Sequence, residues 1–417
     1  MNLTPFRDAA KLAIQLARER TPRVEECLLS SAQGRVLAED VVASEMLPGF
    51  RSAALDGFAL SSTGAGLLSP SGTQLLVMGR ILAGQTDFRD CSNREPHAHR
   101  IMTGAPVPRC SCAVVGKEDV SEDGGSIVLQ RDVPSGFAVR PIGSDVQHGT
   151  RLARCGDRIT AGHFLAFASL GVSSVKVAAR PRVAFAATGA ELHPADTRTL
   201  PFGSIRDSST PFLLAALRAR GIVPIDTKTL PDERPAIDQW LEDCKDVDVV
   251  LTTGGVSVGD ADHLRASLES TGATIHLHGV AMRPGKPLLI ATLPPAQGGA
   301  VVFALPGNPY ASAAAAAFFV NPCLDALQGA RSQSLCAATL RGHVRTPANL
   351  TCLWRARASV SGDGRLEATV HPARESYRVS AFLETNAWAM LEGCEAGISD
   401  GTNISVLLDD SIDGPDR

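Results

Sequence analysis

DVVLTTGGVSVGDAD, residues 248–262, indicates a buried strand, a tight turn and the start of a helix. The run VVL is typical of a strand that is buried on both faces. Gly254 and Gly255 let the backbone approach a ligand closely and present its N–H groups. Because ligands of open α/β sheets bind beyond the carboxyl ends of the strands, we expect the chemistry of the protein at this turn.

Asp260 and Asp262 follow the turn, where the helix should start. A carboxylate at such a position can cap the helix or bind a metal ion. An ordinary strand-to-helix turn with Asp260 as its cap is therefore the alternative interpretation of this stretch.

Strands and helices alternate on both sides of this stretch. Strands that alternate with helices of 10–15 residues form βαβ units, so the pattern predicts a parallel sheet covered by helices. The sequence indicates strands at 183–187, 222–228, 248–253 and 301–305, and helices at 208–220, 234–245, 260–270 and up to residue 327.

The flanking regions have a different character. Apolar residues at helical spacing predict an amphipathic helix at 4–20, and helix-like patterns follow at 27–37 and 158–172. Short apolar runs between Gly, Ser, Pro and Asp clusters predict β-rich structure after residue 50 and again after residue 330. We expect a multidomain α/β and β protein of four parts: a helical domain from 1–48 and 143–178, an inserted β-rich domain at 49–142, an α/β domain at 179–329 and a β domain at 330–417.

The composition narrows the class of protein. The chain has 417 residues, 44% hydrophobic and 20% charged, with a net charge of −4. It contains no basic domain of the kind that binds nucleic acid. No apolar run reaches the roughly 18 residues of a membrane span, and the charged N-terminus has no signal-peptide core. Ten cysteines at irregular spacings predict free thiols, and a cytoplasmic protein.

Four further segments combine small residues, proline and isolated charges. They are SAALDGF at 52–58, RIMTGAPVP at 100–108, ATGAEL at 187–192, and the pair RPGKP at 283–287 with LPGNP at 305–309. Alone, each is compatible with an ordinary turn or with solvated surface charges. Arg283 and Lys286 on a proline-stiffened loop suit an oxyanion. Glu191 beside an anion-binding turn suggests a bridging Mg²⁺.

Together, in this order, these segments resemble those of the molybdenum insertase family, the MoeA proteins and the E domain of gephyrin. SAALDGFA resembles the family's NSAMDGYA, ATGAEL resembles STGDEL, and RPGKP resembles KPGKP. RIMTGAPVP and LPGNP are the family's own runs, and GGVSVGDAD matches closely. The similarity covers nearly the whole chain.

The resemblance implies a particular fold and reaction. The fold has an elongated helical piece, an inserted β module, an α/β pterin-binding domain and a C-terminal β-barrel. The active site of a homodimer would lie between the α/β domain of one subunit and the N-terminal modules of the other. The reaction is Mg²⁺-dependent insertion of molybdate into adenylylated molybdopterin, which yields molybdenum cofactor and AMP.

The resemblance also implies roles for individual residues. We expect Asp56, Glu191 and Asp262 to bind Mg²⁺, and Thr103 and Lys286 to act with them in catalysis. Arg283 and Lys286 would hold molybdate or phosphate oxygens. The remaining substrate-binding residues implied by the family are Asp145, Gly189, Asp232, Gly254, Gly255, Ser257, Pro306, Pro309, Arg355 and Ser380.

Some positions depart from the family pattern. Arg51 and Gly279 replace an aspartate and an active-site lysine, and Ala190 and Ser209 replace an aspartate and an asparagine. Loss of a cation should weaken anion binding by about 1–3 kcal/mol where it made a charge-assisted hydrogen bond. A molybdopterin adenylyltransferase, a divergent paralogue and a non-catalytic scaffold like gephyrin therefore remain alternative functions. Protein partners would be the adenylyltransferase and cofactor-accepting molybdoenzymes.

Overall fold

A six-stranded mixed sheet forms the centre of the computed structural model, which describes residues 3–61, 68–85, 95–255, 263–331 and 334–409. The first three pairings in the sheet order are parallel and the last two are antiparallel, so the fifth strand in the order runs opposite to the other five. This confirms the α/β fold predicted from the alternation of strands and helices. In sheet order the strands are β18 (Asp226–Leu230), β15 (Val183–Thr188), β19 (Val249–Thr253), β23 (Val301–Leu305), β22 (Leu289–Thr292) and β20 (Thr274–His278).

Helices cover both faces of this sheet. Phe185, Leu251 and Phe303 point to one face, against α1 (Phe6–Arg18), α3 (Ser209–Ala219), α6 (Pro309–Ala315) and α7 (Asn321–Leu327). Ala186 and Val250 point to the other face, against α4 (Arg234–Asp243) and α5 (His263–Ser270). Successive strand residues alternate between two apolar cores, which explains why the strands are continuous hydrophobic runs.

Helix α1 belongs to this core rather than to the elongated piece. Its buried residues pack against α7 and the preceding π-helical segment Ala316–Val320. Phe6 makes edge-to-face contacts with Phe318 and Phe319 at 5.8 and 5.4 Å. The expected grouping of residues 1–48 with 143–178 therefore does not describe how α1 packs.

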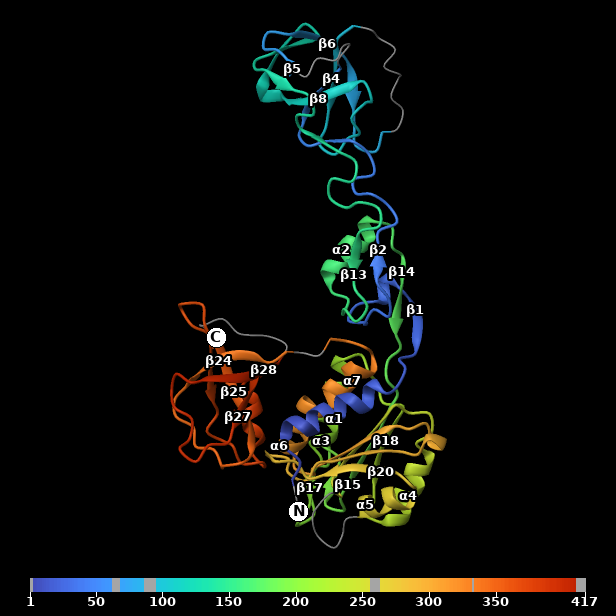
Figure 1. Cartoon of the computed structure of the whole chain (residues 1–417), viewed down its shortest axis with the longest axis vertical. Helices are drawn as coiled ribbons and strands as arrows, with labels where there is room; N and C mark the ends of the chain where they lie inside the picture. Colours follow the sequence, from blue (N-terminus) through green and yellow to red (C-terminus); the bar gives the residue numbers. More distant parts are fainter. Residues whose placement is uncertain (1–2, 62–67, 86–94, 256–262, 332–333, 410–417) are drawn as a thin grey trace.

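Residues 21–178, which we call the arm, extend away from the α/β unit (Figure 1). The arm base pairs β1 (Val24–Leu28) with β14 (Ser174–Ala178) and β2 (Val41–Val42) with β13 (Arg151–Ala153), beside α2 (Ala161–Ser169). The prediction of a helix at 27–37 was wrong. Strand β1 and a 3-10 turn at Leu29–Ser31 occupy its first part, because pairing with a strand almost 150 residues away satisfies the backbone there.

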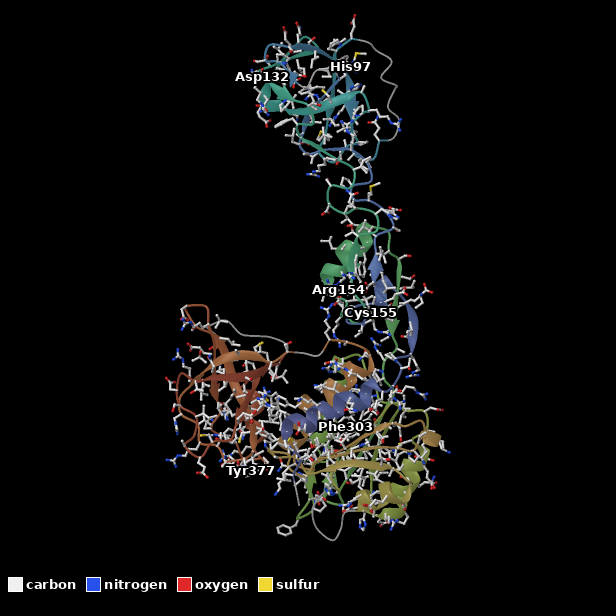
Figure 2. The ribbon with its side chains drawn as sticks, viewed as in Figure 1. His97, Asp132, Arg154, Cys155, Phe303 and Tyr377 are labelled. Atoms are coloured by element: carbon white, nitrogen blue, oxygen red, sulfur yellow. The ribbon has the colours of Figure 1, made fainter. Side chains whose placement is uncertain are left out.

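The inserted β module forms the far end of the arm. A six-stranded sheet in the order β8, β4, β7, β6, β10, β9 encloses its own apolar core. His97 and Asp132 lie in this module, far from Phe303 in the α/β core (Figure 2). The strands of the module are β3 (Ser52–Ala53), β4 (Gly57–Ser61), β5 (Leu68–Ser69), β6 (Gln74–Ile81), β7 (His97–Ile101), β8 (Ser111–Gly116), β9 (Val120–Asp123), β10 (Ser126–Leu129), β11 (Val133–Pro134) and β12 (Val139–Arg140).

The C-terminal region is a closed five-stranded barrel beside the α/β unit. Its strands are β24 (Cys336–Arg341), β25 (Thr351–Val360), β26 (Leu366–Val370), β27 (Ala387–Glu392) and β28 (Asn403–Leu408), and the β25–β27 pairing closes it. Strand β21 (Met282–Arg283) of the α/β unit joins its edge. Tyr310 of α6 is buried against Trp388, and its hydroxyl accepts the Arg355 N–H at 2.6 Å.

Two whole-chain features complete the fold. Among the described residues, one continuous helix, Pro309–Leu327, is long and apolar enough to cross a membrane. Its apolar stretch is 83% buried inside the protein, as in a core helix. In the part of the chain that the structure describes, eight cysteines are free thiols, but Cys110 is disulfide-bonded. The prediction that every cysteine is free was therefore wrong.

Candidate active site

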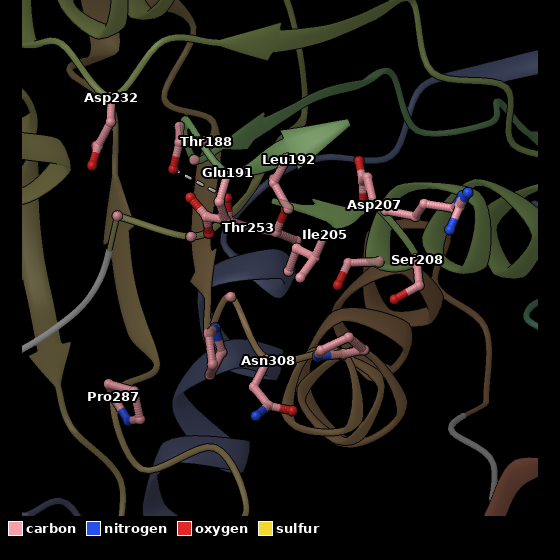
Figure 3. A pocket seen from close by; sticks show the side chains of 18 residues that line it. Thr188, Glu191, Leu192, Ile205, Asp207, Ser208, Asp232, Thr253, Pro287 and Asn308 are labelled. Atoms are coloured by element: carbon pink, nitrogen blue, oxygen red, sulfur yellow. Dashed lines mark hydrogen bonds between the residues drawn. The ribbon is translucent and has the colours of Figure 1, made fainter. Parts of the chain in front are cut away.

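A cavity of 380 Å³ opens at the carboxyl ends of β15, β19 and β23 and at the turn after β18. Its walls also include the first residues of α3 and α6 (Figure 3). The cavity lies where the sequence 248–262 led us to expect the chemistry. Its lining includes seven of the predicted site residues: Gly189, Glu191, Asp232, Gly254, Gly255, Pro306 and Pro309.

The floor of the cavity is formed by two strand ends in close contact. Gly254 has a φ of +84°, and a Cβ there would lie 2.2 Å from the carbonyl oxygen of Thr188. The hydroxyl of Thr188 donates to the carbonyl of Thr253 at 3.2 Å, and the N–H of Gly254 donates to the carbonyl of Leu305 at 3.2 Å. Only glycine fits between β15 and β19 at this point.

Two carboxylates in the cavity have no partner in the described parts of the chain. Glu191 follows the end of β15, and its carboxylate folds back to within 3.0 Å of the Cβ position of Gly189. Asp232 follows β18 on the neighbouring side. Both side chains are exposed. Their negative charge makes this an unfavourable site for a bare anion.

The oxygen donors of the cavity fit a hard divalent cation. Mg²⁺ is commonly held by one or two carboxylates together with water and substrate phosphates. Among the described residues, no three His, Cys, Asp or Glu side chains lie close enough to hold a metal ion by themselves. A cation bound by Glu191 and Asp232 would therefore need further ligands from water, from the substrate or from residues outside this described set.

Asp207 also lines the cavity, and the sequence reasoning did not assign it. Its carboxylate accepts the N–H of Thr210 at 3.0 Å, so it caps the first turn of α3. Its own N–H donates to the carbonyl of His193 at 2.8 Å, next to the short parallel pair β16 (Leu192–His193) and β17 (Ile205–Arg206). An aspartate three residues before the N–H it caps is the sequence signal that could have identified it.

The rim facing the barrel is formed by the LPGNP turn. Asn308 occupies the N-cap position of α6 without a capping side-chain hydrogen bond, and its side-chain amide donates instead to the hydroxyl of Ser376 in the barrel at 3.0 Å. Pro287 lines the same side of the cavity, and Lys286 immediately precedes it. Arg283 and Lys286 are both exposed, without a side-chain partner among the described residues. Lys286 is therefore an unneutralised cation next to a residue that lines the acidic cavity, whereas Arg283 lies in β21 beside the barrel.

Asp56 and Thr103 form a second cluster, in the β module. The Asp56 carboxylate accepts the N–H of Thr103 at 2.7 Å and its hydroxyl at 2.8 Å. These hydrogen bonds, that of the backbone N–H first, lower the pKa of the Asp56 carboxyl below its usual range. Asp145 is exposed in the stretch that leads from the module back to the arm base. Within one chain, neither aspartate lies with Glu191.

Arg355 lies elsewhere, on the wall of a second cavity of 900 Å³ between the barrel, α3 and the arm base. It is 3% exposed, its guanidinium forms an ion pair with Asp409, and it stacks on Phe382 and Trp388 at 5.0 Å. Ser380 is exposed on the barrel. Ser257 and Asp262 fall outside the described residues.

The family departures have defined surroundings. Arg51 donates to the carbonyl of Ser111 at 2.9 Å within the β module. Gly279 has a φ of +99°, and its carbonyl accepts the N–H of Thr4 at 3.0 Å. Ser209 is buried at the start of α3, and Ala190 is exposed beside the cavity. Arg51 is thus held in place by the module and does not stand in the cavity of its own chain.

The fold and the cavity define a multidomain α/β protein with an acidic cavity at the carboxyl edge of its sheet. Three family models match the chain in order: the MoeA N-terminal region (domain I and II) at residues 4–171, a probable molybdopterin binding domain at 184–326, and the MoeA C-terminal region (domain IV) at 337–408.

Curated relatives match the chain over most of its length. A molybdopterin molybdenumtransferase of Synechococcus elongatus is 35% identical, over 94% of this chain and 95% of that protein. One from Bacillus subtilis is 32% identical, over 94% and 91%. The crystal structure of the molybdopterin biosynthesis moeA protein from Pyrococcus horikoshii superposes with a TM-score of 0.81 at 25% identity, covering 98% of this chain and all of that one. The chain belongs to the MoeA family.

Proposed function

We propose that this protein is a molybdopterin molybdenumtransferase, an enzyme of molybdenum cofactor biosynthesis. It inserts molybdate into adenylylated molybdopterin and releases molybdenum cofactor and AMP. The observation that carries the proposal is the acidic 380 Å³ cavity at the strand ends, in a chain 35% identical to a relative of that name. We also propose a division of the chain into four parts: 1–48 with 143–178, 49–142, 179–329 and 330–417. Helix α1, although it belongs to the first part by sequence, packs on the α/β part.

The glycine turns would bind the phosphorylated end of the pterin. Gly189 and Gly255 would offer N–H groups that no side chain of their own covers. Gly254, whose N–H already donates to the carbonyl of Leu305, would let the ligand approach the backbone closely. Ser257 would add a hydroxyl from the adjoining turn. Pro306 and Pro309 hold the opposite wall rigid, and Pro309 starts α6 with its N-terminus at the cavity.

The carboxylates would bring the metal to the substrate. Glu191 and Asp232 are available because no described residue pairs with them, and Asp262 and Asp56 would complete the set. When bound, Mg²⁺ neutralises charge on the adenylate phosphate. Thr103 keeps Asp56 ionised and oriented through its two hydrogen bonds at 2.7 and 2.8 Å.

Arg283 and Lys286 would hold the molybdate oxygens at the cavity rim. Both cations project from a loop stiffened by Pro284 and Pro287, which limits the entropy lost when an oxyanion binds. Asp145 and Ser380 would contact the substrate from the arm and the barrel. Arg355 is already paired with Asp409 inside the barrel, and its backbone N–H donates to Tyr310 of α6, so its role would be to dock the barrel on the α/β unit.

The protein would work as a homodimer. Asp56 and Thr103 lie on the arm and Glu191 in the α/β unit, so one chain does not bring the two clusters together (Figure 1). A second chain related by a twofold axis would supply the missing cluster to each cavity. We also propose a cytoplasmic location, with the adenylyltransferase and cofactor-accepting molybdoenzymes as protein partners.

The test is turnover by the purified full chain with adenylylated molybdopterin, molybdate and MgCl₂. AMP release and activation of a cofactor-free molybdoenzyme are measured together. Glu191→Gln and Asp56→Asn should each reduce turnover by about 10²-fold or more, because each removes a charge that acts on the reacting phosphate. Asp196→Asn, an exposed acid on the same loop outside the cavity, should leave it unchanged.

Mixing the two inactive variants tests the shared site. If each cavity is completed by the partner subunit, random re-pairing leaves one intact site in half of the dimers and recovers about a quarter of the wild-type turnover. No recovery on mixing would refute the shared site. ATP-dependent adenylation of molybdopterin without molybdate insertion would instead identify an adenylyltransferase.

A further inference from the structure

The arm meets the α/β unit through polar contacts. The apolar core of the arm base, which includes Phe167 and Val177, shares no described residue with the core of the α/β unit. The orientation of the arm therefore rests on its two linkers and on the side chains that hold them. Two buried or half-buried aspartates, Asp325 and Asp248, gather these contacts.

Asp325 joins the arm base to α7. Its side chain is 5% exposed and accepts Arg158 of the arm at 3.0 Å and Arg220 of the α/β unit at 2.7 Å. The second Arg158 nitrogen donates to the carbonyl of Gly34 at 2.7 Å, so this guanidinium bridges two arm segments and α7. Because Arg220 also pairs with Asp325, the carboxylate stays neutralised even if Arg158 is lost.

The loop before Arg158 reinforces this junction. Gly156 packs so closely on the end of α7 that a Cβ would lie 2.7 Å from the carbonyl oxygen of Gly329. Its carbonyl accepts the N–H of Arg331 at 3.3 Å, and the Arg331 guanidinium lies 3.4 Å from Asp157. Figure 2 shows the neighbouring Arg154 and Cys155 on the α7-facing part of the arm base.

Asp248 contacts both of the linkers that join the arm to the α/β unit. It precedes β19, at the end of the strand opposite the cavity. Its carboxylate accepts Arg20 at 3.1 Å and Arg23 at 2.8 Å from the linker into the arm, and the N–H of Arg182 at 2.7 Å from the linker out of it. Arg20 also donates to the carbonyls of Gly298 and Gly299, at 2.6 Å each.

We propose that Arg158 and Asp325, together with Asp248 and its arginines, are positioning residues that set the angle of the arm. The arm is long and carries Asp56 at its far module, so a small rotation at the base becomes a large displacement of that carboxylate (Figure 1). A displacement of about 1 Å can reduce turnover on the order of 10²-fold. For its catalytic readout this inference rests on the proposed function.

The test variant is Arg158→Met, alone and with Asp157→Asn, in the full-length dimer. Turnover should fall about 10–100-fold, whereas the dissociation constant for molybdopterin should stay within about twofold, because the cavity itself is unchanged. Arg158→Lys, which keeps the charge, should recover most of the loss. Small-angle X-ray scattering should show a broader range of arm positions in the double variant.

The matched control is Arg151→Met. Arg151 pairs with Asp40 at 3.1 Å within the arm base and does not reach the α/β unit, so turnover should stay near wild type. Equal losses in Arg151→Met and Arg158→Met, or wild-type turnover in the double variant, would overturn the inference. If the wild type does not insert molybdate at all, the proposed function fails, and an unchanged scattering curve in the double variant then refutes the positioning role separately.

Discussion

Gly254→Ala should be the most disruptive single-methyl change in the cavity. Two separate effects act on this position. The backbone has a φ of +84°, which disfavours an L side chain by about 1–2 kcal/mol. The new methyl group would also stand 2.2 Å from the carbonyl oxygen of Thr188, and forcing extra volume into packed structure costs about 1–3 kcal/mol. We therefore expect a loss of about 2–5 kcal/mol in the stability of the α/β unit.

Gly401→Ala in the barrel separates the two effects. Gly401 has a φ of +78°, but a Cβ there would meet no atom within 4 Å, so only the backbone term of about 1–2 kcal/mol applies. Hydrogen exchange, measured for each peptide separately, gives the free energy of local opening. It is measured for β15 and β19 in Gly254→Ala and for the barrel strands in Gly401→Ala. This measurement avoids a single unfolding curve for a multidomain chain.

The comparison has a clear negative result. If both variants lose the same free energy, within about 0.5 kcal/mol, the close approach of β15 and β19 contributes nothing and the explanation for the glycine is wrong. Binding of molybdopterin should fall in Gly254→Ala and stay unchanged in Gly401→Ala, because only the first alters the cavity floor.

Three further outcomes follow. Thr103→Val should raise the pKa of Asp56 toward its usual value by removing the hydroxyl hydrogen bond, measurable by carboxyl NMR; an unchanged pKa would contradict the geometry. Since the folded pKa of Asp56 is lowered, its stabilising contribution is present above the unfolded value of about 3.9 and is lost as the pH falls through the folded pKa. Tyr310→Phe should destabilise barrel docking by about 1–3 kcal/mol, since it leaves the buried Arg355 N–H unpaired, whereas the exposed Tyr377→Phe should have little effect in urea unfolding. Chelation of divalent cations should abolish turnover, with recovery on adding MgCl₂ and little change in thermal unfolding, because the proposed ligands Glu191, Asp232 and Asp56 are exposed and belong to none of the apolar cores.

Local sequence patterns determined the central elements of this protein. The apolar runs at 183–187, 248–253 and 301–305 are strands because each can bury side chains on both faces, and the glycines that end them appear at the cavity. The order of short motifs was enough to identify the family. These features depend on neighbours in the sequence, so pattern and propensity are sufficient to predict them.

Only the tertiary structure decided which distant segments meet. The last two residues of β1 fell in a predicted helix, because its partner β14 lies nearly 150 residues away and no local pattern reports that pairing. For the same reason the sequence did not show that α1 packs on α7, that Asp207 lines the cavity, or that Asp409 neutralises Arg355. Long-range hydrogen bonds and ion pairs form only in the folded chain. The same folded arrangement places Asp56 on the arm, apart from Glu191 of the same chain.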